Sequence, residues 1–382
     1  MKTTRPGAAV ASVTRRRKTH DMDLSGAVHF YYLFDVADTI DLAGLTTVAG
    51  EGVTAAPLPL RPHTSPAYLQ FPAPPLIARL PDRPLRGHAV TPRVKLFDYG
   101  VISVRLTVAY SGNLDGIQAL LTELRGADET AQLARDVAER VQADIPRALD
   151  EPHAALVEDY NIVEIERTDP TLSGSDFVER HAMQLAQLLL GETGPLAPSE
   201  VEEALRVRFA YYADDLTIVQ WDIALVYDRR DSAEAIEDIL EFANAQLVEL
   251  RTYDALLDRE LDVIYAAKPT RGFLQTLLGR RAADQAANLR YLIVDVLELL
   301  DRSSNALKMI GDAYYARIYR GAGARLGLAD WQQQVNEKLA SVGDMYRFFN
   351  DQARAARDEF LELIVILLFL VEIVIGFVQL KH

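Results

Sequence analysis

The stretch VKLFDYGVISVRLTVAY, residues 94–110, decides the fold class of this chain. Its β-branched and aromatic residues are typical of a strand. Gly100 interrupts the run, and a glycine inside a strand pattern marks a bend. Asp98 lies in the same apolar surroundings, where we expect backbone donors to satisfy its carboxylate. The stretch therefore predicts one bent strand or two strands joined at Gly100.

Further strand-like segments flank this stretch on both sides. They lie at residues 27–36, 159–166 and 205–228, and the last is predicted to be a hairpin that turns at Ala213, Asp214 and Asp215. Helix-like segments alternate with them, at residues 37–45, 113–124, 128–145 and 173–191. Strands and helices in this order predict an α+β fold with a mostly antiparallel sheet.

Small polar residues and a glycine mark the expected helix ends. Asn113 or Asp115, Asp128, and Ser173 or Ser175 are suitable N-terminal caps, because their side-chain oxygens accept from free backbone N–H groups. Gly191 is the expected stop of the third helix in this part of the chain.

The second half of the chain reads as long helices. Apolar residues recur at alternating spacings of four and three from Ile236, from Leu289 and from Val335, which is a heptad pattern. Residues 268–272 and 321–330 are the expected breaks between the helices. Short connections predict an antiparallel bundle or coiled coil. Asp254 and Ser303 occupy positions of the pattern, where we expect them to fix the register.

The chain closes with EFLELIVILLFLVEIVIGFVQLKH, residues 359–382. Residues 360–378 are apolar except for two glutamates and would span roughly 28 Å as a helix, close to the bilayer core. This predicts a single-pass transmembrane anchor at the C-terminus. Arginines precede the span, which predicts that the bulk of the chain lies in the cytoplasm, at the inner membrane.

The two glutamates are Glu362 and Glu372. Glu362 can lie at the membrane interface, whereas Glu372 would lie among the lipid chains, where a carboxylate is costly. Glu372 is then either a proton-handling group or a polar contact between helices. We favour the contact, because a single span makes a poor proton path.

Composition limits the classes of function. The chain has 382 residues, no cysteine and a net charge of −15, although its first 20 residues hold six basic and no acidic side chains. Disulfides and thiolate metal sites are excluded. An acidic body should repel nucleic acid, so only the basic arm around Arg15–Lys18 offers a binding region for RNA.

No motif for a reaction is present. The seven histidines lack metal-ligand spacing, and there is no phosphate-binding loop, nucleophile elbow or dinucleotide fingerprint. We therefore predict no catalytic, cofactor-binding or metal-binding residue and no cofactor.

Several stretches resemble the required-for-meiotic-nuclear-division family, also catalogued as domain of unknown function 155. They include KLFDYGVISVRL, YADDLTIVQWDIALVYD and FLELIVILLFLVEIVI. The resemblance implies an α+β domain, a coiled coil and a C-terminal membrane anchor, with no established enzyme activity. It marks as family-typical the residues Asp98, Tyr99, Gly100, Asp215, Trp221, Glu362 and Glu372.

The sequence thus predicts a basic disordered arm (1–24), an α+β domain (25–228), a helical coiled-coil stalk (229–358) and a transmembrane anchor (359–382). The favoured function is a membrane-anchored, non-enzymatic scaffold that self-associates and meets an unidentified protein partner. The alternative is a small-molecule sensor or enzyme with a pocket around Asp98, Tyr99 and Trp221. Nucleic-acid binding through the arm is the least favoured.

Overall fold

The computed structural model describes residues 24–55, 73–166, 172–266 and 310–379, with a few helical positions between 290 and 301. Three expectations lie outside the described residues. They are the basic arm up to residue 23, the break at residues 268–272 and most of the heptad pattern that begins at Leu289.

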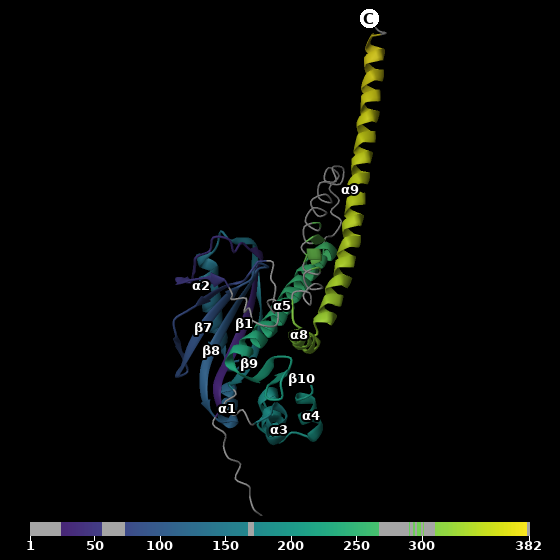
Figure 1. Ribbon diagram of the computed structural model, residues 1–382. Coiled ribbons are helices and arrows are strands. Elements are labelled where there is room, and N and C mark those ends of the chain that lie inside the picture. Colours follow the sequence, from purple (N-terminus) through teal and green to yellow (C-terminus); the bar gives the residue numbers. More distant parts are fainter. Residues whose placement is uncertain are drawn as a thin grey trace, which may run out of the picture.

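One large, strongly paired sheet forms the centre of the molecule (Figure 1). Its middle strand β1 (Leu24–Ile40) pairs antiparallel with both β8 (Val101–Gly112) and β9 (Leu149–Glu166). Beyond β8 lie β7 (His88–Leu96), β5 (Leu76–Arg79) and β4 (Thr54–Ala55), with β6 (Arg83–Leu85) paired to β7. Beyond β9 lie β12 (Ile223–Asp228), β11 (Leu216–Val219) and β10 (Arg208–Phe209). A separate small hairpin joins β2 (Thr47–Val48) to β3 (Glu51–Gly52).

The pairing is antiparallel except between β12 and β9, which run parallel. A parallel pair needs a crossover connection, and the chain between these two strands contains helices. The fold is therefore an α+β sheet domain with one parallel junction.

The two faces of the sheet bury two different cores. Side chains of β1 alternate between them, with Phe30 and Tyr32 on one face and Tyr31 and Leu33 on the other. The first face is covered by helices α1 (Leu114–Leu124), α2 (Asp128–Asp144) and α3 (Gly174–Leu190), followed by the short α4 (Pro198–Ala204). The second face is covered by α5 (Arg230–Ala266).

The helix ends follow the expected chemistry. The side chain of Asn113 accepts from the backbone N–H of Gly116, and Ser173 accepts from Asp176. Gly191 ends α3 in the left-handed conformation. These three assignments are confirmed, whereas the cap at Asp128 is wrong, because Asp128 is the first residue of α2 and Ala127 occupies the cap position.

Two local predictions are wrong. Residues 37–45 do not form a helix, because β1 continues to Ile40 in pairing with β9. Residues 205–228 form three strands rather than one hairpin, because a second tight turn at Gln220–Asp222 follows the loop at residues 210–215. The first difference comes from pairing with a distant strand, which overrides local pattern, and the second from an additional turn.

Helices α5, α8 (Ala313–Leu326) and α9 (Leu328–Gln379) build the second half. The α5 and α9 heptad positions pack together, with Leu250 and Leu257 of α5 and Val335 and Val342 of α9 fully buried. Asp254 pairs with Lys338 of α9 at 2.7 Å. The break before α9 is the single residue Gly327 and not the whole of 321–330, since α8 continues to Leu326.

The predicted C-terminal membrane anchor is wrong. Within the described part of the chain, no helix combines the length and the apolar character that a bilayer crossing requires. The exposed apolar side chains that the structure describes at the end of α9 run from Leu361 to Ile375, and Glu362 and Glu372 interrupt them. The predicted inner-membrane location depended on this span and is overturned with it.

Candidate functional site

A set of charged side chains lies between the sheet and α5, on the face where most residues are apolar. The alternation of β7, β8, β1 and β9 places Arg93, Arg105, His29 and Glu164 on that face. Helix α5 faces them with acids at spacings of three and four, which form one stripe of the helix: Glu234, Glu237, Asp238 and Glu241.

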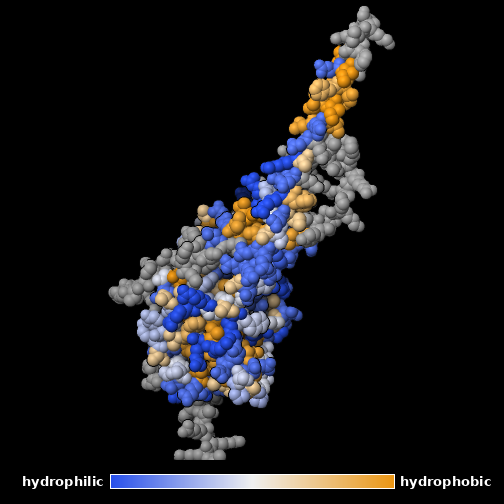
Figure 2. Space-filling view, turned by 90° about the vertical axis from the view of Figure 1, so that its right-hand side faces the viewer, coloured by the Kyte–Doolittle hydropathy of each residue, from blue (hydrophilic) through white to orange (hydrophobic). Residues whose placement is uncertain are grey.

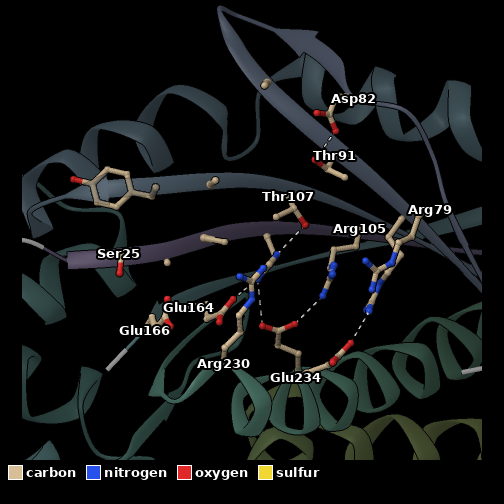
Figure 3. Close-up of a pocket in the computed structure, with 18 residues that line it drawn as sticks. Ser25, Arg79, Asp82, Thr91, Arg105, Thr107, Glu164, Glu166, Arg230 and Glu234 are labelled. Carbon is tan, nitrogen blue, oxygen red and sulfur yellow. Dashed lines mark hydrogen bonds and ion pairs between the residues drawn. The ribbon is translucent and has the colours of Figure 1, made fainter. Parts of the chain in front are cut away.

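His29 is at the centre of this charged group and is 3% exposed. Its Nε2 lies 3.2 Å from an oxygen of Glu164 and 3.2 Å from an oxygen of Glu237. Its Nδ1 lies 3.0 Å from the hydroxyl oxygen of Thr107, which fixes the orientation of the ring. The second oxygen of Glu237 accepts a hydrogen bond of 2.8 Å from Arg105. Figure 3 shows Arg105 and Thr107 of β8 and Glu164 of β9 around this point, with dashed lines for the contacts.

The protonation of this group follows from its charges. Burial disfavours the imidazolium of His29, but Glu237 and Glu164 outweigh that effect and raise the pKa of His29 above its ordinary value. Burial likewise opposes ionisation of Glu237, yet the His29 and Arg105 cations hold the pKa of that carboxyl well below its usual range. Without another cation, a proton on His29 balances the two carboxylates.

Two more cations of β7 lie beside this group. Lys95 donates to Asp238 at 2.8 Å and also pairs with Glu241. Arg93 is 4% exposed, but it is held less well, with Glu234 at 3.5 Å and Glu241 at 3.7 Å. Its Nε and Nη2 make no hydrogen bond with any described residue.

A cavity of about 630 Å³ opens beside these groups. His29, Glu164, Glu237, Arg93 and Arg105 all contribute to its wall, and further polar lining comes from Arg79, Asp82, Glu166, Arg230 and Glu234. The volume suits a small molecule. Within the described chain, His29, Glu164 and Glu237 are also the group whose ligand atoms lie close enough together, within 4.8 Å, to hold a metal ion.

The residues that the sequence marked as family-typical lie elsewhere and serve the fold. Gly100 adopts φ +84°, and a Cβ on it would collide with the carbonyl oxygen of Ala37. Tyr99 is buried and stacks on Phe97 with ring centroids 5.0 Å apart. The backbone carbonyl of Asp98 accepts from Ile40 at 2.8 Å.

The second family-typical stretch forms turns. The carboxylate of Asp215 accepts from the backbone N–H groups of Tyr211 and Tyr212 at 2.7 and 2.9 Å, closing the loop between β10 and β11. Trp221 is 66% exposed in the turn between β11 and β12.

The structure does not bring Trp221 together with Asp98 and Tyr99. Ile223, which follows the turn with Trp221, pairs with Asn161 of β9, and Asn161 pairs with Phe30 of β1. The backbone carbonyl of Asp98 instead accepts from Ile40, at the other end of β1. Ten residues of strand separate these points, roughly 30 Å. Glu362 and Glu372 are exposed on α9, far along the chain from all of them.

Sequence reasoning missed every residue of the charged group. One signal was present: on strands that otherwise bury their side chains, Arg93, Lys95, Arg105 and Thr107 recur at spacings of two. Polar residues at that period share a sheet face, and a polar stripe within an apolar sheet is a candidate site.

The comparison with known families bears on residues 25–234. The family described as "Uncharacterized protein MJ0711, N-terminal domain" matches this range, more than half of the chain. The chain belongs to this family. "Uncharacterized protein MJ0711" of Methanocaldococcus jannaschii is 23% identical over 211 residues, which is 55% of this chain and 63% of that protein. No solved structure matches the chain.

The resemblance to the required-for-meiotic-nuclear-division family is therefore wrong, since the family that matches is a different one. The residues that suggested it explain the error. Asp215 closes a loop and Gly100 permits a close strand crossing, and turns between antiparallel strands select such residues in many unrelated sheets. The matching range includes β1, β8 and β9, and with them His29, Arg105 and Glu164, but it ends just before Glu237.

Proposed function

We propose that this protein is a binding protein whose α+β domain takes up a small polar molecule with an anionic group, such as a phosphate or carboxylate. The observation that carries the proposal is Arg93. Its guanidinium is buried at the cavity wall, and two of its three nitrogens make no hydrogen bond with a described residue.

A buried guanidinium nitrogen without a hydrogen-bond partner is costly, because its N–H groups have left water and found no acceptor. An anion in the cavity would supply that compensation through paired N–H···O bonds, the geometry that guanidinium groups favour. Arg79 and Arg230 also line the cavity, and neither forms an ion pair with a described residue. These three cations mark the part of the cavity wall where the anionic group would bind.

The test uses the full chain in buffer with EDTA. Thermal unfolding is followed with inorganic phosphate, citrate and nucleoside monophosphates. A ligand at about one hundred times its Kd should stabilise the native state by about 2.7 kcal/mol. Arg79→Gln should reduce the shift, whereas Arg83→Gln, on β6 outside the cavity lining, should keep it. Equal shifts in both variants, or none in the native chain, would contradict the proposal.

A second candidate function is self-association as a scaffold. Large apolar side chains near the end of α9 are each about half exposed, as the orange band on the long helix in Figure 2 shows: Leu361, Leu363, Val365, Ile366, Leu367, Leu368, Phe369, Leu370, Val371, Ile373 and Ile375. A patch of this size is unusual on a monomer. A second copy offers an apolar helix of the same length, which makes it the occupant that we propose.

Light scattering of the full chain over a concentration series tests this candidate. The native chain should show an oligomer, and the pair Leu367→Glu with Leu370→Glu should shift it to a monomer, because both changes place charge in the apolar contact. Gln334→Glu adds a charge on an exposed part of α9 outside the patch and should leave the oligomer intact. A monomeric native chain would rule the scaffold out.

A further inference from the structure

We propose that His29, Glu164 and Glu237 bind a divalent metal ion of the class of zinc, manganese or ferrous iron. This goes beyond the proposed function, because the ion can bind with or without an anionic ligand in the cavity. The three residues come from β1, β9 and α5, so the ion would join the sheet to the helix that covers it.

The separations between the three side chains are those of a coordination shell. An ion about 2.0–2.2 Å from imidazole and carboxylate ligands holds neighbouring ligand atoms roughly 3.0–3.5 Å apart. Nε2 of His29 lies 3.2 Å from each of the two glutamate oxygens. All three ligand atoms lie within 4.8 Å of one another. Small side-chain movements would therefore suffice to surround an ion.

The groups behind the ligands also fit a metal site. Histidines that bind metals commonly donate their other ring N–H to a fixed acceptor, which orients the ring. Thr107 is that partner for Nδ1 of His29 at 3.0 Å. Arg105 holds the outer oxygen of Glu237 and leaves its other oxygen toward His29. His29 and Glu237 are thus positioned before an ion arrives.

The cavity gives the site an open side. A closed structural zinc site has four protein ligands, whereas three ligands beside a space leave a position for water or an exchangeable molecule. All three ligands line the cavity of about 630 Å³. Arg93, in the same wall, keeps two guanidinium nitrogens without a described hydrogen-bond partner. An anion on the open position of the metal would lie where such a cation can reach it.

The choice of metal follows from the ligand types. Magnesium and calcium prefer oxygen ligands alone, whereas a nitrogen from imidazole favours zinc and iron, and the two carboxylates also suit manganese. The ion competes with the proton on Nε2 of His29, because only the neutral imidazole can coordinate. Binding should accordingly weaken as pH falls.

The experiment uses tag-free full-length protein stripped with EDTA and dialysed against zinc or manganese chloride, with bound metal counted by mass spectrometry. We expect one ion per chain in the native protein. Glu164→Gln should bind at least about tenfold more weakly. Asp150→Asn, an exposed acid of the same strand outside the cavity lining, should bind as the native chain does.

Two results would overturn the site: no metal retained by the native chain, or equal retention by Glu164→Gln. In either case a proton on His29 alone balances the carboxylates. If Glu164→Gln does not fold, Thr107→Val takes its place, since it removes only the partner of Nδ1 and should also weaken binding. The anionic-ligand test is run with EDTA and this test without phosphate, citrate or nucleotides, so either proposal can fail alone.

Discussion

At the scale of single residues, His29 shows how burial and neighbours set one charge. It faces Glu164 of β9, Glu237 of α5, and Arg105 and Thr107 of β8. The carboxylates prevail over burial and over the arginine, so the charged imidazole is the favoured form when no metal is bound.

This balance predicts how stability depends on pH in buffer with EDTA. The folded-state pKa of His29 is raised, so its contribution is complete below the ordinary pKa of 6.5 and is lost as pH rises through the folded value. The pKa of Glu237 is lowered, so its contribution is present above the ordinary pKa of 4.5 and is lost at more acid pH. The urea concentration at the midpoint of unfolding should thus be highest between pH 4.5 and pH 6.5, the ordinary pKa values of the two groups.

Two histidine variants check that prediction. His29→Gln should flatten the loss of stability on the alkaline side, whereas His88→Gln, at a partly exposed pair with Glu123, should retain it. If the urea midpoint of the native chain does not change from weakly acid to weakly alkaline pH, His29 is not held as a cation.

Gly100 permits a second prediction for a single residue. Gly100 and Gly87 both have positive φ angles, 84° and 86°. A Cβ at Gly100 would meet the carbonyl of Ala37, whereas nothing lies within 4 Å of a Cβ at Gly87. Gly100→Ala should therefore lower the free energy of unfolding by more than about 2 kcal/mol and Gly87→Ala by about 1 kcal/mol. Chemical denaturation measures both, and equal losses would mean that the collision is relieved.

At the scale of elements, the long helices depend on each other. The heptad pattern of α5 and α9 correctly indicates which residues they bury against one another, such as Leu250 and Val335. The polar position Asp254 pairs with Lys338, which also reaches Asp258 at 2.7 Å. A buried carboxylate that pairs with a lysine of the facing helix is expected to fix the register of α5 against α9.

This ion pair predicts a local effect on α9. Lys338→Met leaves the buried Asp254 without its cation and should lower stability by roughly 1–2 kcal/mol. Hydrogen exchange should show reduced protection in α9 around residue 338 while the central sheet is unchanged. Asp258→Asn is the control, because Asp258 is 56% exposed and its pair is screened by water. Unchanged exchange in Lys338→Met would show that the pair of Asp254 and Lys338 does not stabilise the contact between α5 and α9.

At the scale of the whole molecule, α5 belongs to the same core as the sheet. It covers Tyr31, Leu33, Tyr160 and Ile162, all nearly inaccessible to solvent. Removing the helix would expose these side chains together with the charges of Arg93 and Arg105. Burial of these apolar side chains is the main free-energy contribution that holds α5 against the sheet.

A pair of fragments tests this dependence. Residues 24–228 end before α5 and should be aggregated or without a cooperative thermal transition. Residues 24–266 include all of α5 and should unfold cooperatively, because the second face of the sheet is then covered. Circular dichroism and size-exclusion chromatography compare them, and a stable, monomeric short fragment would show that α5 is a separate stalk.

The sequence by itself determined what depends on near neighbours. Alternation along the strands separates Phe30 from Tyr31, the caps at Asn113 and Ser173 begin helices, and heptads select the buried residues of α5. These patterns have periods of two and about 3.6 residues, so a short segment contains them completely.

Only the tertiary structure decided which distant residues meet. His29 and Glu164 lie 135 residues apart and come together because β1 pairs with β9, and Glu237 joins them because α5 packs across that face. The apolar end of the chain misled the sequence reasoning for the same reason, since composition does not say whether a helix crosses a bilayer or meets another chain. Strand register and helix docking are set by the burial of the whole core, and no local pattern encodes them.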